Sequence, residues 1–397
     1  MAEWQMFRLG EIVKTNQSTY STKENWQFVN YLDTGNITMN KVDKIQYINA
    51  AKDKLPSRAR RKVKIDSIIY STVRPNQLHY GIIKEHPDNF LVSTGFTVID
   101  VEHDKAVPDF IYYALTKQEV TEQLQAIAEQ SVSAYPSLKP SDIENLELML
   151  PDKKTQERIV SILRLIDEKI MENNAINNNL EQQAQALYQK MFIKNANPEW
   201  TEGTISDLGI VVGGSTPSKA KPEYYTQHGI AWITPKDLSL NKSKFITRGE
   251  NDISELGLRN SSTTIMPKGT VLFSSRAPIG YIAIAAGDVT TNQGFKSIVP
   301  KSEIGTAFVY YFLKNAIPTI EGMASGSTFK EISRSTMKSV PAFIPNNDAL
   351  TKFNEFCTPI FEQQQLLESQ NQQLSKMRDT LLPKLISGEL DVSDIDI

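Results

Sequence analysis

The spacing of apolar residues along the chain predicts the same set of elements twice. Four short segments are rich in β-branched and aromatic residues and predict strands, at residues 67–73, 90–101, 270–274 and 280–286. Residues 108–128 follow the first pair of segments, residues 307–317 follow the second, and both carry apolar side chains at helical spacing. The pattern therefore predicts two mixed α/β domains of similar build.

A long helix is predicted to follow each domain. No glycine or proline occurs between Pro151 and Pro198, and apolar residues recur there at nearly seven-residue spacing. The same pattern follows the second domain at an offset of 194 residues. We expect the two helices to pack through positions that share one heptad register, namely Ile159, Ile166, Leu180, Leu187, Phe353, Ile360, Leu367, Leu374 and Leu381.

Asn173 interrupts this apolar series in the first helix, within a run rich in asparagine. Two interpretations are equally open. A polar residue at a core position can fix the register of paired helices. Alternatively, the run is a frayed and solvated helix centre.

Matching segments indicate that the chain is an internal duplication. The segment FIYYAL at residues 110–115 recurs as FVYYFL at residues 308–313, an offset of 198, and other matches keep the same order. A period of this length is a whole domain rather than a short solenoid repeat. We interpret the paired tyrosines as buried core rather than as platforms for stacked bases, at Tyr112, Tyr113, Tyr310 and Tyr311.

The predicted fold class is α+β, with two pseudo-symmetric mixed α/β domains separated by two long antiparallel coiled-coil helices. If a pseudo-two-fold axis relates the halves, the antiparallel helices place the domains at opposite ends. The predicted boundaries are residues 1–150 for the first domain, 151–196 for the first helix, 197–346 for the second domain, 347–390 for the second helix and 391–397 for a C-terminal tail.

Composition predicts a cytoplasmic protein with no membrane partner. No apolar run approaches the roughly 18–20 residues that span a bilayer, and the N-terminal residues do not resemble a signal peptide. The single cysteine, Cys357, excludes an intramolecular disulfide and a cysteine zinc cluster. The formal net charge is −3, so any contact with nucleic acid has to come from local basic patches.

One basic tract in the first domain is the main candidate for DNA contact. Thirteen residues, 52–64, hold seven basic side chains and one acidic side chain, the basic ones being Lys52, Lys54, Arg58, Arg60, Arg61, Lys62 and Lys64. A solvated surface loop is the alternative. Arg74 and Arg276 follow corresponding strands, which is consistent with a shared structural role or with phosphate contact. The candidates in the second domain are more dispersed, at Lys219, Lys221, Lys236, Lys242, Lys244, Arg248 and Arg259.

The chain lacks the motifs of the enzymes that act on DNA. An adenine methyltransferase needs an Asn/Asp-Pro-Pro-aromatic motif, and the nearest string, at residues 197–200, has Glu199 in place of the second proline. No Gly-x4-Gly-Lys-Ser/Thr phosphate loop occurs, and the four histidines have no metal-ligand spacing. We therefore expect no catalytic residues, no metal site and no cofactor in this chain.

Several blocks resemble the specificity subunits of Type I restriction–modification systems. The run RDTLLPKLISGEL at residues 378–390 is similar to the end of that family's second conserved helix, and Pro151, Gln156, Ile159, Leu163 and Asp167 are similar to the opening of the first. Blocks similar to those of the family's recognition domains are GGSTPS at 213–218, WITPKDL at 232–238, SRAPIGY at 275–281, TNQGF at 291–295 and GSTF at 326–329.

The resemblance implies that each domain is a target-recognition domain that reads one half of a split site in double-stranded DNA. It implies two methyltransferase subunits and two restriction or translocase subunits as partners, with S-adenosylmethionine, ATP and magnesium held on those partners. The helices would set the gap between the half-sites. It also implies a bacterial or archaeal host.

The basic tract has no close copy in the second half, which predicts two different half-sites. Two other function classes remain as alternatives. A fused methyltransferase fragment would bind S-adenosylmethionine, and a purely structural coiled-coil adaptor would tolerate loss of the basic tract.

Overall fold

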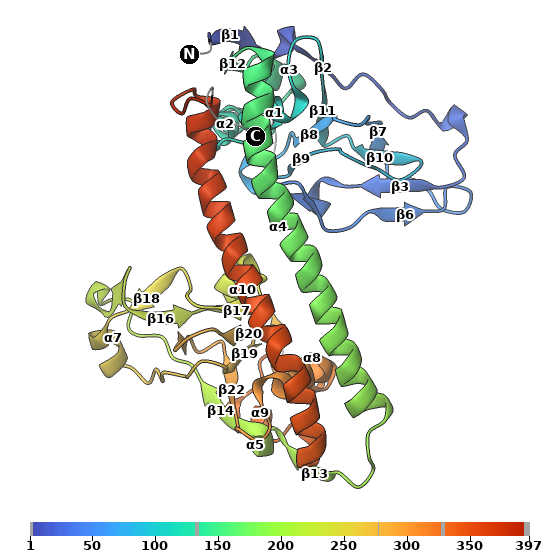
Figure 1. The fold of residues 1–397 in the computed structure, drawn as a ribbon. Helices are drawn as coiled ribbons and strands as arrows, with labels where there is room; N and C mark the ends of the chain where they lie inside the picture. Colours follow the sequence, from blue (N-terminus) through green and yellow to red (C-terminus); the bar gives the residue numbers. More distant parts are fainter. Residues whose placement is uncertain (1–2, 132–134, 277, 327–329, 393–397) are drawn as a thin grey trace. The chain divides into compact units, whose positions relative to one another are not determined.

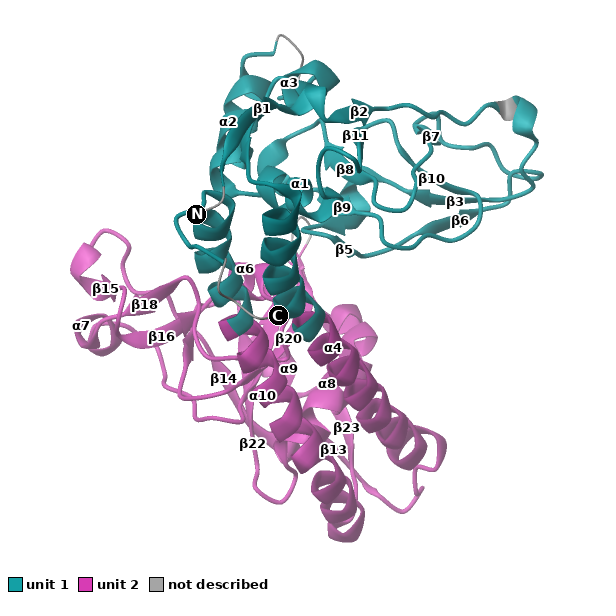
Figure 2. Ribbon diagram, turned by 45° about the horizontal axis from the view of Figure 1, so that its top comes forward, with its two compact units in different colours: residues 1–169, 374–397 teal, residues 170–373 magenta. Residues whose placement is uncertain are grey.

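The structure is a computed structural model that describes residues 3–131, 135–276, 278–326 and 330–392. Parts of three sequence predictions lie outside the described residues: most of the block at 326–329, Ala277 within the block at 275–281, and the tail from residue 393. The chain forms two compact units (Figure 2). Unit 1 is Met1–Lys169 with Leu374–Ile397, and unit 2 is Ile170–Gln373.

Unit 1 contains two four-stranded sheets. In the first, every neighbouring pair is antiparallel, and the order is β2 (Val13–Thr15), β11 (Phe96–Val101), β8 (Ile68–Ser71) and β9 (Tyr80–Ile82). The second has the order β6 (Gln46–Ile48), β3 (Val29–Leu32), β10 (Phe90–Ser93) and β7 (Ala59–Arg61), with β3 and β10 parallel. Two antiparallel pairs complete the unit: β1 (Gln5–Arg8) with β12 (Glu147–Leu150), and β4 (Ile37–Thr38) with β5 (Lys41–Val42).

Unit 2 repeats this plan. Its larger sheet has the order β14 (Gly209–Gly213), β22 (Lys296–Pro300), β19 (Val271–Ser275), β20 (Ile279–Ala285) and β17 (Phe245–Ile246). Its smaller sheet has the order β15 (Tyr225–Thr226), β18 (Asn251–Ile253), β16 (Ile230–Ile233) and β21 (Thr290–Thr291), with β16 and β21 parallel. A ribbon of β13 (Thr201–Thr204) and β23 (Pro341–Ile344) corresponds to β1 and β12.

The shorter helices differ in number between the units, and most of them are labelled in Figure 1. Unit 1 has α1 (Pro108–Leu115), α2 (Gln118–Glu129) and α3 (Pro140–Glu144), and unit 2 has α5 (Ile205–Leu208), α6 (Pro235–Leu240), α7 (Glu255–Arg259), α8 (Thr306–Met323) and α9 (Arg334–Lys338). Short 3-10 turns span Leu9–Glu11, Thr22–Glu24, Thr34–Asn36, Pro75–Gln77 and Pro222–Tyr224. The single helix expected over residues 108–128 is interrupted between α1 and α2.

Two sequence blocks of the second domain fold locally for identifiable reasons. In WITPKDL, Thr234 caps α6 by accepting from the Asp237 amide, and Pro235 stands in the first turn where no amide hydrogen is needed. In GGSTPS, a Cβ on Gly214 would lie 2.4 Å from the carbonyl oxygen of Thr291, so only glycine fits there. The glycine-rich block is therefore a close backbone contact with the TNQGF block.

The main core of each unit lies between its larger sheet and its helices. Tyr112, Tyr113, Tyr310 and Tyr311 are buried in these two cores, with exposed fractions of 2–8%. The prediction that the paired tyrosines are core residues is confirmed.

Two long helices, α4 (Lys153–Tyr188) and α10 (Asn347–Ile386), each contribute to both units. In unit 1, Ile159 and Leu163 of α4 share a core with Leu385 near the end of α10. In unit 2, Tyr188 at the end of α4 packs on Phe353 near the start of α10, with ring centroids 5.9 Å apart. The start of each helix thus packs with the end of the other, as expected for an antiparallel pair. A π-helical turn, Gln189–Lys194, extends α4.

The predicted heptad positions lie on the inner side of these helices. Ile159, Ile166, Phe353, Ile360 and Leu367 are buried. The remaining four are half-buried: Leu180, Leu187, Leu374 and Leu381.

Asn173 is fully buried in unit 2 and bonds across the helix pair. Its side-chain amide donates to Oδ1 of Asn371 at 2.9 Å, and the Asn371 amide donates to Oδ1 of Asn174 at 2.9 Å. α4 is continuous through this point, so a frayed centre is excluded. The polar contact is of the kind that fixes the register of paired helices.

Candidate nucleic-acid interface

The basic tract of unit 1 forms the loop after β6 and the edge strand β7. On one edge β7 pairs with β10, and on the other it bonds to residues 18–20: the Tyr20 amide donates to the Arg60 carbonyl at 2.7 Å, and the Lys62 amide donates to the Ser18 carbonyl at 3.1 Å. Ala59 is 1% exposed and packs into a small core with Tyr31 and Leu91, while Arg60 and Arg61 are half-buried. One small apolar residue therefore anchors a strand whose other members are arginines.

The members of the tract differ in how free they are. Lys52, Lys54 and Arg58 are exposed, and no ion pair is found for them among the described residues. Lys62 pairs with Glu24 and lies 5.1 Å from the centre of the Trp26 ring. The charge of Lys62 is thus already partly neutralised within the protein.

Two further members of the tract have protein contacts. Lys64 is exposed and its Nζ lies 3.4 Å from Asp100. Burial lowers the pKa of Arg61, and its Nε has no hydrogen-bond partner among the described residues. The loop from Lys52 to Arg58 is therefore the part of the tract best placed to contact phosphate.

Arg74 and Arg276 occupy corresponding strand ends but have different surroundings. Arg74 is exposed, has a left-handed backbone with φ of 49°, and lies 5.1 Å from the centre of the Tyr135 ring. Arg276 is half-buried and lies 3.4 Å from Glu331, which also faces Lys296 at 3.5 Å. The contacts of Arg276 favour a structural role, whereas Arg74 presents its guanidinium to solvent.

The candidates in unit 2 are dispersed over its surface. Lys219, Lys221, Lys236, Lys242, Arg248 and Arg259 are exposed. Lys236 pairs with Glu250 at 2.7 Å, and Arg248 and Arg259 pair with Asp252 and Glu255. The pairing leaves Lys219, Lys221 and Lys242 without a carboxylate partner among the described residues.

Lys244 does not fit the prediction of DNA contact. Its side chain is 6% exposed, and Nζ lies 2.7 Å from Glu181 of α4 and 2.9 Å from Oε1 of Gln364 of α10. It also lies 3.7 Å from the centre of the Phe361 ring. The assignment of Lys244 to the DNA surface is wrong, because the neighbouring helices bury and neutralise it.

The two smaller sheets share three strands and differ at one edge. β6, β3 and β10 correspond to β18, β16 and β21 in order and direction. Unit 1 adds β7 beside β10, whereas the described part of unit 2 has a single antiparallel bridge at that edge, Met266 with Val289, and its extra strand, β15, lies on the opposite edge. The basic tract therefore belongs to a strand that the described part of unit 2 replaces with a single bridge.

Neither a metal cluster nor a membrane-spanning helix is found in the described part of the chain. Among the described residues, no group of three or more His, Cys, Asp or Glu side chains is placed to hold a metal ion. None of the helices in the described ranges has both the length and the apolar character needed to cross a bilayer.

The family model for the Type I restriction modification DNA specificity domain matches residues 1–182 and again residues 197–376. The chain belongs to this family. The two matches follow the internal duplication, so this specificity chain carries two DNA specificity domains. Both small sheets, with their different edges, lie within the matched specificity domains.

Relatives cover the whole chain or one part of it. The Type I restriction enzyme HindI specificity subunit of Haemophilus influenzae is 27% identical over 98% of this chain and all of its own length. The MjaIX specificity subunit of Methanocaldococcus jannaschii is 43% identical over 39% of this chain and 36% of its own. A Type I restriction–modification S subunit from M. genitalium shares the fold, with a TM-score of 0.61 at 16% identity over 97% of this chain and 96% of that one.

Proposed function

We propose that this specificity chain reads a two-part, asymmetric site in double-stranded DNA, one part with each unit. The observation that carries the proposal is the basic edge strand β7 and its preceding loop, which unit 2 does not reproduce. An exposed cluster of lysine and arginine attracts DNA phosphates and can place an arginine against a guanine edge. Different edges on the two small sheets favour different half-sites.

The paired helices and the partner subunits complete the proposal. α4 and α10 set the gap between the half-sites through their fixed register. Two methyltransferase subunits dock on the chain, and two restriction subunits join the full complex. These partners hold S-adenosylmethionine, ATP and magnesium and perform all of the chemistry, so the chain itself is not catalytic and acts in the cytoplasm.

Reversing two charges in the exposed loop tests the DNA contact. In Lys52→Glu/Lys54→Glu, the complex should bind its DNA more weakly. The slope of log affinity against log salt should fall by about 1 for each phosphate that the variant no longer neutralises. Fluorescence anisotropy at several salt concentrations measures both. A matched control, Lys139→Glu/Lys154→Glu, changes the net charge equally on exposed lysines outside the small sheet and should keep the wild-type slope.

Mapping of modified adenines tests the asymmetry. Expression of the chain with its methyltransferase subunit should give a motif of two unequal parts separated by unspecified bases. A palindromic or continuous motif that depends on this chain would contradict the proposal.

A further inference from the structure

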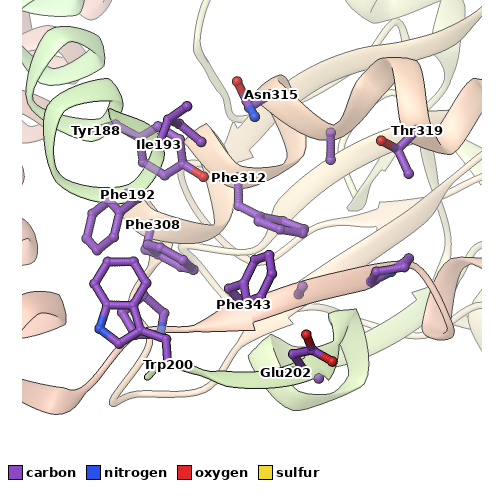
Figure 3. A pocket seen from close by; sticks show the side chains of 15 residues that line it. Tyr188, Phe192, Ile193, Trp200, Glu202, Phe308, Phe312, Asn315, Thr319 and Phe343 are labelled. Carbon is purple, nitrogen blue, oxygen red and sulfur yellow. The ribbon is translucent and has the colours of Figure 1, made fainter. Parts of the chain in front are cut away.

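A cavity of about 460 Å³ opens beside the β13–β23 ribbon of unit 2 (Figure 3). Its wall is aromatic: Phe192 of the π-helical turn lies 5.6 Å from Trp200 and 4.9 Å from Phe308 of α8, measured between ring centroids. Phe312, one turn further along α8, also lines it. Sites of this volume and character hold the apolar part of a ligand or of a partner.

The ribbon of unit 1 carries larger side chains at two of the positions that line this cavity. The strand registers make Phe7, paired with Leu148, the counterpart of Gly203, paired with Ala342. Phe7 packs against the core of unit 1 and Leu148 is 7% exposed. Unit 2 thus lacks two large side chains at the corresponding positions, and Gly203 and Ala342 both line the cavity.

Both ribbons expose apolar side chains on their outer faces. In unit 1, Met6 is 63% exposed and stands opposite Met149, which is 41% exposed. In unit 2, Phe343 is 59% exposed and stands opposite Glu202. Exposed apolar side chains at matched places in a duplicated chain indicate one kind of partner that binds twice.

The polar groups at the cavity identify the chemistry of that partner. Glu202 is the only charged residue among those that line it, all of which are described, and Asn315 and Thr319 add polar atoms. An acidic group beside an aromatic wall repels DNA phosphate and attracts a lysine or arginine next to an apolar anchor. Such anchors commonly carry much of the binding energy of a protein interface.

We infer that this cavity receives a large apolar side chain of the methyltransferase subunit, flanked by a basic residue that pairs with Glu202. This inference rests on the proposed function, which names the methyltransferase subunit as the docking partner. It adds that the two units are unequal docking sites. Unit 2 holds its copy of the partner through an inserted anchor, and unit 1 holds its copy through a shallow contact at Met6 and Met149.

Substitutions of two residues that line the cavity test the inference. Ala342→Leu gives unit 2 the side chain that Leu148 provides in unit 1. Glu202→Lys reverses the charge on an exposed side chain and leaves the core intact. Each variant of the full chain should bind the purified methyltransferase subunit at the stronger of its two sites at least about tenfold more weakly, as measured by titration calorimetry.

A matched pair of variants provides the control. Phe343→Ser and Met149→Ser remove exposed apolar side chains from equivalent positions, and Phe343→Ser should weaken the stronger site while Met149→Ser affects the weaker one. Thermal unfolding of Ala342→Leu should match the wild type.

Three outcomes overturn the inference. Unchanged affinity in both Ala342→Leu and Glu202→Lys removes the cavity from the docking surface. If Ala342→Leu changes the sedimentation of the chain alone, the occupant is a second copy of the chain. If the wild-type chain does not bind the methyltransferase subunit, the proposed function itself fails.

Discussion

In each unit, the second tyrosine of the repeated Tyr-Tyr pair donates to a carboxylate of α4, but the ion pairs of that carboxylate differ. In unit 1, Tyr113 donates to Asp167 at 2.7 Å, and Arg378 donates to the other oxygen of that carboxylate at 3.0 Å. In unit 2, Tyr311 donates to Glu181 at 2.9 Å, and Glu181 also accepts from a lysine outside the long helices. The duplicated core has kept the tyrosine and replaced its charged neighbours.

The replacement changes what the cluster connects. Arg378 and Asp167 both belong to the long helices, and their side chains are 21% and 30% exposed. In unit 2, Lys244 comes from the recognition domain itself, and the amides of Lys244 and Phe245 both donate to Glu368 of α10 at 2.9 Å. The unit 2 cluster therefore ties its domain to both long helices through buried charge, whereas the unit 1 cluster is a partly hydrated contact between helices.

Removing the buried lysine should have the largest effect. Lys244→Met leaves Glu181 without its closest cation and removes the three hydrogen bonds that Nζ makes. Breaking a buried pair by removing one partner costs about 3–5 kcal/mol, and we expect the lower value because Lys314 remains 2.8 Å from Glu181. Urea denaturation measures the loss of unfolding free energy.

A double variant tests whether the cost comes from the stranded carboxylate. Lys244→Met/Glu181→Gln should regain part of the lost stability, since no unpaired charge is then buried. A loss below about 1 kcal/mol in the single variant would show that the cluster does not hold unit 2 together.

The sequence predicts the duplicated architecture of the two units but not their different charged clusters. The duplication, the long helices and the buried tyrosine pairs follow from local spacing and from repeated segments. Local sequence does not distinguish Lys244 from a surface lysine, because its partners Glu181 and Gln364 lie 63 and 120 residues away in the chain. Similarly, the arginine-rich β7 has little strand character of its own and forms because Ala59 packs and β10 offers an edge.

Acid should weaken unit 2 through Glu181. Burial alone would raise the pKa of Glu181, but Lys244 and Lys314 outweigh it and lower that pKa from 4.5 to about 2. A lowered carboxyl pKa stabilises the folded state above the unfolded value, and this contribution is lost as the pH falls from about 4.5 towards 2. At about 1.4 kcal/mol for each pKa unit, the complete loss is about 3.5 kcal/mol, of which about 2 kcal/mol falls between pH 5 and pH 3.

The Glu181→Gln variant isolates this contribution. It should be less stable than the wild type at neutral pH and should lose less stability between pH 5 and pH 3, as followed by urea denaturation at each pH. If the variant and the wild type lose stability in parallel over that range, the ion pairs of Glu181 do not control the acid response. Burial lowers the pKa of Lys244 to about 8 although Glu181 raises it, so Glu181→Gln should lower the pKa of Lys244 further.

The smallest effect should come from the corresponding arginine of unit 1. Arg378→Met removes the bond to Asp167, but Asp167 is 30% exposed and can be hydrated, so we expect a loss of about 1 kcal/mol. Arg378→Lys should recover little of it, because one ammonium cannot reproduce the separate guanidinium contacts to Asp167 and Asp379. If Arg378→Met costs as much as Lys244→Met, burial does not decide the strength of these clusters. The two units would then be held to the helices equally, although only one of them supplies a charge from its own recognition domain.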